Sequence, residues 1–342
     1  MIFSKFMNKL ISICIPTCDR PFLLQEALES CFLQEYDSIE IIIGDDSKNN
    51  NTEKLIKNLQ LTAKHKIHYI RNTPPLGQAR NVNMLFDMAQ GDRLVLLHDD
   101  DLLLPNAIVD LDKCWQIEPG ITAAFGKQYI ISMLGEILLQ ESEDLNRSYY
   151  RTANVEGLQA SAVVSGLLQQ FPNNGYMVLS AAAKNIKYRD RNIVGDACDQ
   201  DFGIRLGMDS DKFYFLNKYT SKYRITTTSS VSNKEDCKIA EFMYPMIEAL
   251  SLPESSEYAR KCALKNLAPL AIKSYALQGR KKEAWNIYFS KNFSLIKRAA
   301  PGGIYLLLLS LLPVNFSKKL LQAQYYLKLK NDSKIKLIDS LR

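Results

Sequence analysis

The chain has 342 residues, of which 46% are hydrophobic and 23% charged, and its formal net charge is +6. This composition is typical of a globular protein with one large domain plus an appendage or with two domains, and it excludes a disordered or fibrous chain. No apolar run is long enough to span a bilayer. The seven cysteines form no CxxC pair or Cys/His cluster, so we expect reduced cytoplasmic thiols without a zinc site or a disulfide framework.

The first third of the chain alternates short apolar runs with amphipathic segments. The apolar runs predict buried strands over residues 11–15, 39–43, 67–70 and 94–97. Helical spacing follows the first three, over residues 21–34, 52–61 and 79–89. The stretch before the first strand is interrupted by lysines and is expected to lead into it, not to act as a signal peptide. This alternation predicts an α/β fold whose mostly parallel sheet is sandwiched by helices.

Polar side chains follow three of these strands. They are Thr17 and Asp19 after the first, Asp45 and Asp46 after the second, and Asp99, Asp100 and Asp101 after the fourth. Ligands of such sheets bind beyond the carboxyl ends of the strands, and adjacent carboxylates resist burial without a counter-charge. Hard oxygen ligands suit Mg²⁺ or Mn²⁺. The pattern predicts a divalent-cation site, with a solvated acidic loop as the alternative; no GxGxxG or GxxxxGK motif follows any strand.

Three segments, ISICIPTCDRP, EIIIGDDS and GQARNVNMLFDMAQGDRLVLLHDDDLLLP, resemble in their order and spacing the family 2 glycosyltransferases of the GT-A fold. The resemblance extends over roughly residues 10–230. It implies an inverting transfer of a sugar from a nucleotide-diphosphate sugar, with a UDP-sugar favoured, using a divalent metal, Mn²⁺ or Mg²⁺. The implied acceptor is a glycan or lipid-linked hydroxyl in bacterial surface polysaccharide synthesis. No nucleic-acid partner is expected.

The resemblance also implies a donor-binding role for several residues. A carboxylate can accept the imide N–H of uracil, and helix-start N–H groups can help a cation to neutralise diphosphate. The implied nucleotide-sugar-binding residues are Pro16, Thr17, Asp19, Asp45, Asp46, Arg80 and Asp99. For Arg80, a plain surface cation is the alternative.

The family's metal-binding acids usually read Asp-x-Asp-Asp, and His98 stands here in the first place. The resemblance aligns Asp100 with the principal metal ligand, with Asp101 as a second ligand and Asp99 near ribose or metal. His98 could bind metal, contact ribose or pack, and we expect packing.

A second segment, Gly195–Leu206, resembles the family segment in which two acids precede an amphipathic helix. Cys198 replaces the first acid, and Asp199 occupies the position of the catalytic base. Asp201 matches a further acid or caps the helix, and Asp196 is the fallback base.

The sequence between and after these segments is less regular. Strands are expected over residues 121–131, 137–139, 213–216 and 219–225, with a helical or loop tract over 145–170 that shapes the acceptor cleft. The segment Phe171–Tyr176 either binds sugar through its amides and aromatics or is simply a loop. Thr226 stands where many relatives carry a histidine that holds metal or diphosphate.

The C-terminal third has helical spacing over residues 241–250, 256–279 and 282–289, so we expect a GT-A domain over 1–232 and a helical region over 233–342. From Lys281 onward, 12 Lys or Arg face 3 Asp or Glu. The apolar stretch 303–314 is flanked by lysines, and it either lies in a membrane interface or is buried against the main domain. We expect a cytoplasmic protein, with peripheral contact at the inner face of the plasma membrane in the first case.

Two further functions stay open. A sugar-nucleotide nucleotidylyltransferase is also an α/β enzyme with metal-binding acids, but it usually has a Gly-rich basic loop after the first strand, which this chain lacks. A degenerate domain that binds nucleotide-sugar or scaffolds a glycan-assembly complex is compatible with the replacements at His98, Cys198 and Thr226.

Overall fold

The computed structural model describes residues 9–210, 212–226 and 238–323. Tertiary contacts divide the chain into two units, Met1–Lys234 and Glu235–Arg342, each of which buries its own apolar side chains. The boundary expected between residues 232 and 233 lies outside the described residues.

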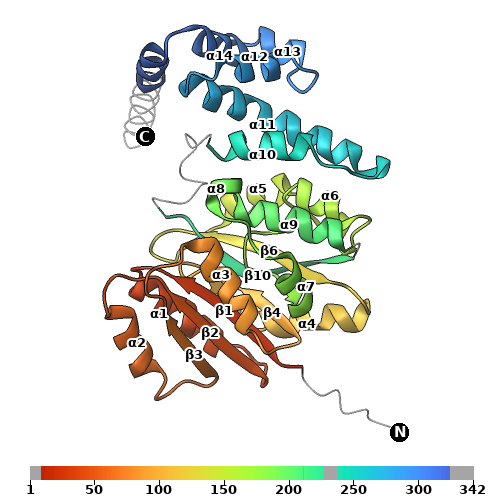
Figure 1. Ribbon diagram of the computed structural model, residues 1–342. Helices are drawn as coiled ribbons and strands as arrows, with labels where there is room; N and C mark the ends of the chain where they lie inside the picture. The colour runs from red at the N-terminus through yellow and green to blue at the C-terminus, as the bar shows by residue number, and fades with distance from the viewer. Residues whose placement is uncertain (1–8, 211, 227–237, 324–342) are drawn as a thin grey trace, which may run out of the picture. The chain divides into compact units, whose positions relative to one another are not determined.

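One mixed sheet forms the centre of the first unit, in the strand order β3-β2-β1-β4-β9-β6-β10-β5 (Figure 1). Four strands pair in parallel on one side, and β6 and β10 pair in parallel on the other. The short β9 joins the two groups by antiparallel pairing with β4 and β6. The strand bounds are β1 Ile11–Thr17, β2 Ile39–Asp45, β3 Lys66–Arg71, β4 Arg93–Leu96, β5 Leu102–Leu103, β6 Ala123–Ile131, β7 Ile137–Leu138, β8 Gly157–Leu158, β9 Met177–Leu179 and β10 Phe213–Arg224.

Helices cover both faces of this sheet, as the side chains of β1 illustrate. Ile11, Ile13 and Ile15 join the core built with α1, α2 and α4, whereas the thiol of Cys14 faces α3, 3.7 Å from the carbonyl oxygen of Leu85. Successive strand residues point to opposite faces, so a fully buried strand needs a helix on each side. The helix bounds are α1 Pro21–Phe32, α2 Asn51–Leu59, α3 Gln78–Met88, α4 Ala107–Ile117, α5 Leu139–Ser148, η1 Ala153–Val155, α6 Ala162–Leu167, α7 Ser180–Ile186, α8 Arg191–Val194 and α9 Cys198–Asp209.

This architecture confirms the predicted α/β class, with differences in the middle of the unit. The two strands expected over 213–216 and 219–225 are one strand, β10, whose register against β6 shifts on either side of Tyr219. Such an irregularity bends a strand without ending it. The polar residues at this point interrupt the apolar pattern, so the sequence alone predicts two strands where the structure has one. The strand expected over 137–139 ends at Leu138, because α5 begins at Leu139.

The second unit consists of helices α10 Lys238–Glu248, α11 Glu257–Leu277, α12 Lys281–Tyr288, α13 Leu295–Ala299 and α14 Pro301–Leu311, with a 3-10 turn, η2, at Glu254–Ser256. The long α11 contacts α10, α12 and α14 and forms the centre of this unit. Among the helices that the structure describes, none has the length and hydropathy needed to cross a membrane.

Candidate active site

The carboxyl ends of β1, β2 and β4 lie next to one another, because β1 pairs in parallel with both neighbours. The backbone N–H of Asp46 donates to the carbonyl oxygen of Thr17 at 2.9 Å, and the hydroxyl of Thr17 donates to the carboxylate of Asp99 at 2.7 Å. Pro16 lies in register with Gly44, at the end of the same strand pair. The polar residues predicted after three separate strands therefore meet at one edge of the sheet.

Asp19 ties the loop after β1 to the loop after β2. Its backbone has a φ of 54°, in the left-handed region that Asp tolerates better than most residues. Its carboxylate accepts hydrogen bonds from the backbone N–H of Lys48 at 3.1 Å and from the side-chain amide of Asn49 at 3.2 Å. The structure thus gives Asp19 a loop-fastening contact at the rim of the site.

Asp45 and Asp46 are adjacent but have different partners. Asp45 is fully buried and accepts hydrogen bonds from the phenol of Tyr69 at 2.7 Å and the N–H of Ser47 at 2.8 Å. Asp46 accepts from Asn72 at 2.8 Å and from the N–H groups of Leu76 and Gly77 at 3.0 and 2.8 Å. Asp45 therefore fastens the strand end, and Asp46 holds the chain at the start of α3.

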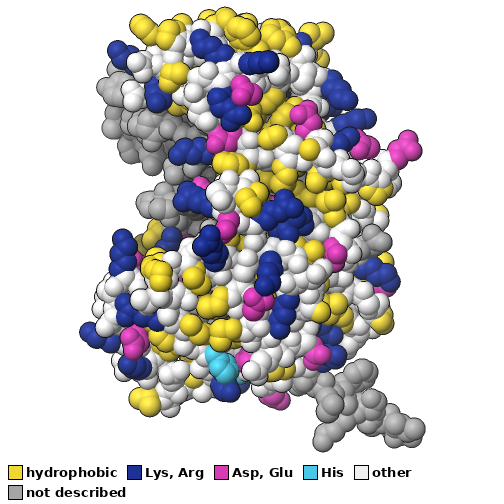
Figure 2. Space-filling model, in the orientation of Figure 1, with side chains coloured by type: hydrophobic (Ala, Val, Ile, Leu, Met, Phe, Trp, Pro, Cys, Tyr) yellow, Lys and Arg dark blue, Asp and Glu magenta, His cyan; other side chains and the backbone are white. Residues whose placement is uncertain are grey.

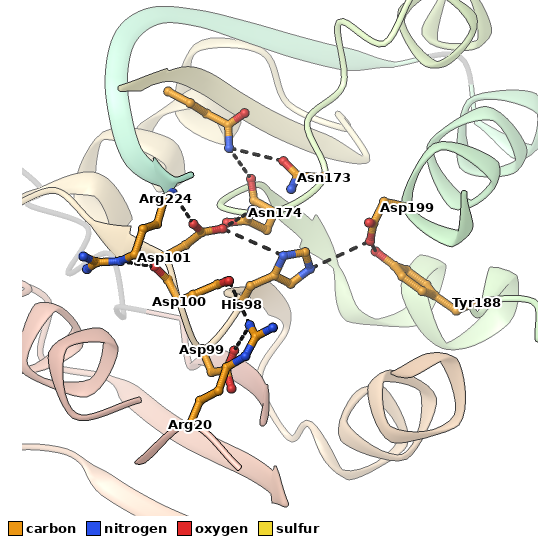
Figure 3. A network of polar contacts seen from close by, with 11 residues as sticks. Arg20, His98, Asp99, Asp100, Asp101, Asn173, Asn174, Tyr188, Asp199 and Arg224 are labelled. Carbon is orange, nitrogen blue, oxygen red and sulfur yellow. Dashed lines mark hydrogen bonds and ion pairs between the residues drawn. The ribbon is translucent and has the colours of Figure 1, made fainter. Parts of the chain in front are cut away.

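Arg20 provides the counter-charge that the three successive acids require. One of its guanidinium nitrogens lies 2.8 Å from the carboxylate of Asp100 and 3.3 Å from that of Asp99 (Figure 3). The pKa of Asp99 is raised to about 6, because burial raises it by more than the neighbouring charge of Arg20 lowers it. No sequence motif singles out Arg20 as a site residue, although the repulsion among the three acids implies that a cation lies near them.

Asp101 is held by residues from distant parts of the chain. Its carboxylate accepts hydrogen bonds from the side-chain amide of Asn174 at 2.7 Å and from the backbone N–H of Arg224 at 2.7 Å. The guanidinium of Arg224 pairs in turn with Glu26 at 2.6 Å. Burial raises the pKa of Asp101. Both carboxylate oxygens of Asp101 are thus held by hydrogen bonds.

The segment Phe171–Tyr176, for which sugar binding and a plain loop were both open, has a third use. Its Asn174 supports Asp101, and the rings of Phe171 and Tyr176 are buried with centroids 4.5 Å apart. The aromatic residues of this segment therefore belong to the core.

His98 connects the acids after β4 to the start of α9. Its two ring nitrogens each lie 3.8 Å from a carboxylate oxygen, Nδ1 from Asp101 and Nε2 from Asp199 (Figure 3). Burial by itself lowers the pKa of His98, but four surrounding carboxylates, Asp199 foremost, raise it, and the net pKa is raised. We expected His98 to pack; it also lies between the carboxylates of Asp101 and Asp199, which it links when its ring is protonated.

Asp199 lies in the first turn of α9, and its carboxylate contacts the phenol of Tyr188. The phenol of Tyr188 donates to its carboxylate at 2.9 Å, and the rings of Tyr188 and Phe202 lie 4.9 Å apart. Burial raises the pKa of Asp199, while His98 and the Tyr188 hydrogen bond lower it. A carboxylate with a raised pKa is a better proton acceptor at neutral pH than a carboxylate with the ordinary pKa of an exposed Asp.

The other acids of the second segment pair away from this centre. Asp201 does not cap α9, contrary to one expectation, because its buried carboxylate pairs with Arg205 at 2.8 Å and Arg189 at 3.5 Å. Asp196 pairs with Arg191 at 2.7 Å.

Arg80 lies at the edge of the site rather than among the acids. Its largely exposed side chain pairs with Asp190 at 3.1 Å. Both residues line a cavity of about 420 Å³ between the start of α3 and residues 190–198, which also reaches Asp196 and Cys198.

The donor atoms at this edge fit a divalent cation. His98, Asp100 and Asp101 can each offer one ligand atom, and these atoms lie within 4.8 Å of one another. The buried Nε2 of His98 has no hydrogen-bond partner. Two carboxylates and a neutral imidazole are a suitable set for Mn²⁺, and the carboxylates suit Mg²⁺; His98 would give up its ring proton to join the set. Thr226, by contrast, is buried and presents no imidazole where many relatives are expected to have one.

Comparisons with known proteins agree with this geometry. The family model "Glycosyl transferase family 2" matches residues 12–159. A Campylobacter jejuni protein, GalNAc(5)-diNAcBac-PP-undecaprenol beta-1,3-glucosyltransferase, is 24% identical over 320 residues, which cover 91% of this chain and 96% of the relative. The uncharacterized glycosyltransferase MJ1057 of Methanocaldococcus jannaschii is 28% identical over 218 residues, or 63% of this chain and 71% of the relative.

Two solved structures share the fold. Staphylococcus aureus TarS 1–349 in complex with UDP superposes with a TM-score of 0.62 at 13% identity, covering 88% of each chain. The mannosyltransferase PcManGT of Pyrobaculum calidifontis, in complex with GDP-Man and Mn²⁺, has a TM-score of 0.57 at 13% identity and covers 90% of this chain and 87% of its own. Residues 12–159 of this chain thus match the model of glycosyl transferase family 2, and the chain has the GT-A fold that these two glycosyltransferase structures share.

Proposed function

We propose that this chain is an inverting glycosyltransferase that uses a nucleotide-diphosphate sugar and acts in the assembly of a bacterial surface polysaccharide. The observation that carries the proposal is the series of contacts from Asp46 through Thr17 and Asp99, and from the neighbouring His98 to Asp199. The acids proposed to bind the donor and the carboxylate of Asp199, which Tyr188 hydrogen-bonds, thereby share one edge of the sheet, and this arrangement supports sugar transfer.

The proposed donor is a UDP-sugar. TarS has been solved with UDP and with UDP-GlcNAc, whereas PcManGT has been solved with GDP-Man, so the fold alone accommodates both bases. Three N–H groups donate to the carboxylate of Asp46, and its remaining lone pair would accept the imide N–H of uracil. Asp99 would hold the ribose, and Arg80 would turn from Asp190 to the diphosphate.

The proposed reaction is one displacement at the anomeric carbon. Asp199 takes the proton of the acceptor hydroxyl as that oxygen attacks, the new C–O bond forms, and the bond to the diphosphate breaks with its electron pair leaving on the nucleotide. Attack opposite to the leaving group inverts the anomeric configuration. Asp100 and Asp101 would hold Mn²⁺ or Mg²⁺, which supplies positive charge for the departing diphosphate.

The proposed acceptor is a lipid-linked glycan, since the Campylobacter jejuni relative is named for an acceptor linked to undecaprenol through diphosphate. Such an acceptor lies in a membrane, so we place the enzyme in the cytoplasm with peripheral contact to the inner face of the plasma membrane.

The test is a donor screen with UDP-, GDP- and dTDP-sugars, a short-chain lipid-diphosphate glycan as acceptor, and Mn²⁺. We expect transfer from a UDP-sugar and a product of inverted configuration by NMR. Donor binding with neither transfer nor hydrolysis would favour the degenerate scaffold instead. Formation of nucleotide-sugar from a nucleoside triphosphate and a sugar phosphate would favour the nucleotidylyltransferase, and retained configuration would contradict the single displacement.

A further inference from the structure

Helix α14 has apolar side chains on both its inner and its outer face. Leu306 and Leu309 are buried, on the side that packs against α11 and α12. Ile304, Leu308 and Leu311 recur at helical spacing on the other side and are 50%, 46% and 50% exposed. The helix contains no charged residue. A helix that is apolar all round is normally buried all round, so we expect another molecule to cover the outer face of α14.

The preceding helix extends this apolar surface. Leu295 and Ile296 of α13 are 76% and 85% exposed, and Ala300 alone separates α13 from α14. The two helices contact each other. Figure 2 shows hydrophobic side chains gathered over the end of the unit that α12, α13 and α14 form. We call Leu295, Ile296, Ile304, Leu308 and Leu311 the apolar face.

Exposed lysines accompany the apolar face, and few acids oppose them. The lysines are Lys282, Lys291, Lys297, Lys318 and Lys319. Glu283 is the single acid in the sequence from residue 281 to 323, and it pairs with Arg280 at 3.0 Å. The positive charge carried by residues 281–323 is therefore largely uncompensated within that stretch.

We propose that the apolar face docks on an anionic lipid bilayer, lying in the interface while the lysines contact the headgroups. Apolar side chains bordered by lysines are the combination that an interfacial helix uses. Charge argues against the two other candidate partners. A second copy would bring a second set of lysines against the first, and residues 324–342 carry five Lys or Arg against two Asp, so both would add positive charge to positive charge.

This surface would bring the enzyme to the layer that holds its acceptor, and in that role it rests on the proposed function. Binding itself can be measured without donor or acceptor. The two proposals can therefore fail separately.

The experiment is co-sedimentation of the full-length chain with vesicles of phosphatidylcholine alone or mixed with phosphatidylglycerol. We expect binding to the mixed vesicles that weakens as salt is raised, and weak binding to phosphatidylcholine alone. Ile296→Ser combined with Leu308→Ser should lower the partition coefficient by at least about tenfold. Lys291→Gln combined with Lys319→Gln should lower it by about tenfold on the mixed vesicles only.

Leu61→Ser is the matched control, since Leu61 is 84% exposed and lies in the other unit. It should bind vesicles like the unaltered chain, and all variants should keep the thermal unfolding midpoint. The proposal is overturned if the unaltered chain stays in the supernatant with anionic vesicles at low salt, or if the apolar variant binds equally well. Self-association that the apolar variant abolishes, without vesicle binding, would assign the face to a second copy. Vesicle binding without any sugar transfer would contradict the proposed function alone.

Discussion

On the proposed donor side of the candidate site, formed by the loops after β1, β2 and β4, Asp46 and Asp99 each have several polar partners. Asp46 accepts three N–H hydrogen bonds, and Asp99 contacts both Thr17 and Arg20. On the proposed acceptor side, Asp199 of α9 has the phenol of Tyr188 and the imidazole of His98 beside it. The difference suits two tasks. Fixed polar partners hold a ligand-binding carboxylate in one orientation, whereas the removal of water around a carboxylate raises its pKa and makes it a better proton acceptor.

The largest expected effect comes from removing the proposed proton acceptor, Asp199. Asp199→Asn should lower turnover by about 10²- to 10⁴-fold, because general-base catalysis contributes that much. Steady-state transfer to the lipid-linked acceptor measures it. Asp209→Asn, which changes an exposed acid at the other end of the same helix, is the control and should be indistinguishable from the unaltered enzyme. A loss below about threefold would assign the base to another group.

The next effect concerns the donor side. Asp100→Ala should weaken Mn²⁺ binding by at least about tenfold, since it removes the carboxylate proposed as the principal ligand. Paramagnetic resonance of Mn²⁺ with the protein in the absence of substrate measures the affinity. Asp87→Ala, at an exposed acid paired with Lys187, should leave it unchanged. Equal Mn²⁺ affinity in the two variants would remove Asp100 from the metal site.

The smallest effect tests the surroundings of Asp199. Tyr188→Phe removes a hydrogen bond that lowers the pKa of Asp199, so that pKa should rise further. Because Asp199 acts as a base only when ionised, the acidic limb of the kcat profile should move to higher pH. At neutral pH kcat should fall by about tenfold or less.

Tyr176→Phe is the control for this shift. Tyr176 is buried in the same aromatic group, but its hydroxyl lies 3.4 Å from that of Tyr188. Its removal leaves the hydrogen bond to Asp199 in place. A pH profile that moves equally in both variants would show that general repacking, and not the hydrogen bond, sets the pKa.

The sequence was sufficient to predict the strands that carry the donor-side acids. Continuous β-branched runs such as Ile39–Ile43 encode buried strands locally, and parallel pairing then brings their carboxyl ends together without knowledge of distant contacts. For this reason Thr17, Asp46 and Asp99 could be expected at one edge. Asp199 was placed through the family resemblance, not through a local pattern.

The partners of these acids could not be predicted in the same way. Asn174 and Arg224 lie 73 and 123 residues from Asp101 along the chain, and no periodicity specifies such a pairing. The requirement for a counter-charge was evident from the three acids, but its identity as Arg20 depends on the turn after β1. Asp201 shows the converse: its position at a helix start favoured a cap, but its carboxylate pairs with Arg205 one turn along the same helix and with Arg189 from outside it.

The separation of binding from proton transfer is tested most directly by isothermal titration of the donor sugar, with Mn²⁺ present, into the Asp199→Asn and Asp100→Ala variants. We expect Asp199→Asn to bind donor with the affinity of the unaltered enzyme, within about twofold, and Asp100→Ala to bind it at least about tenfold more weakly. Donor binding that is lost in Asp199→Asn and retained in Asp100→Ala would contradict the assignment of the two sides.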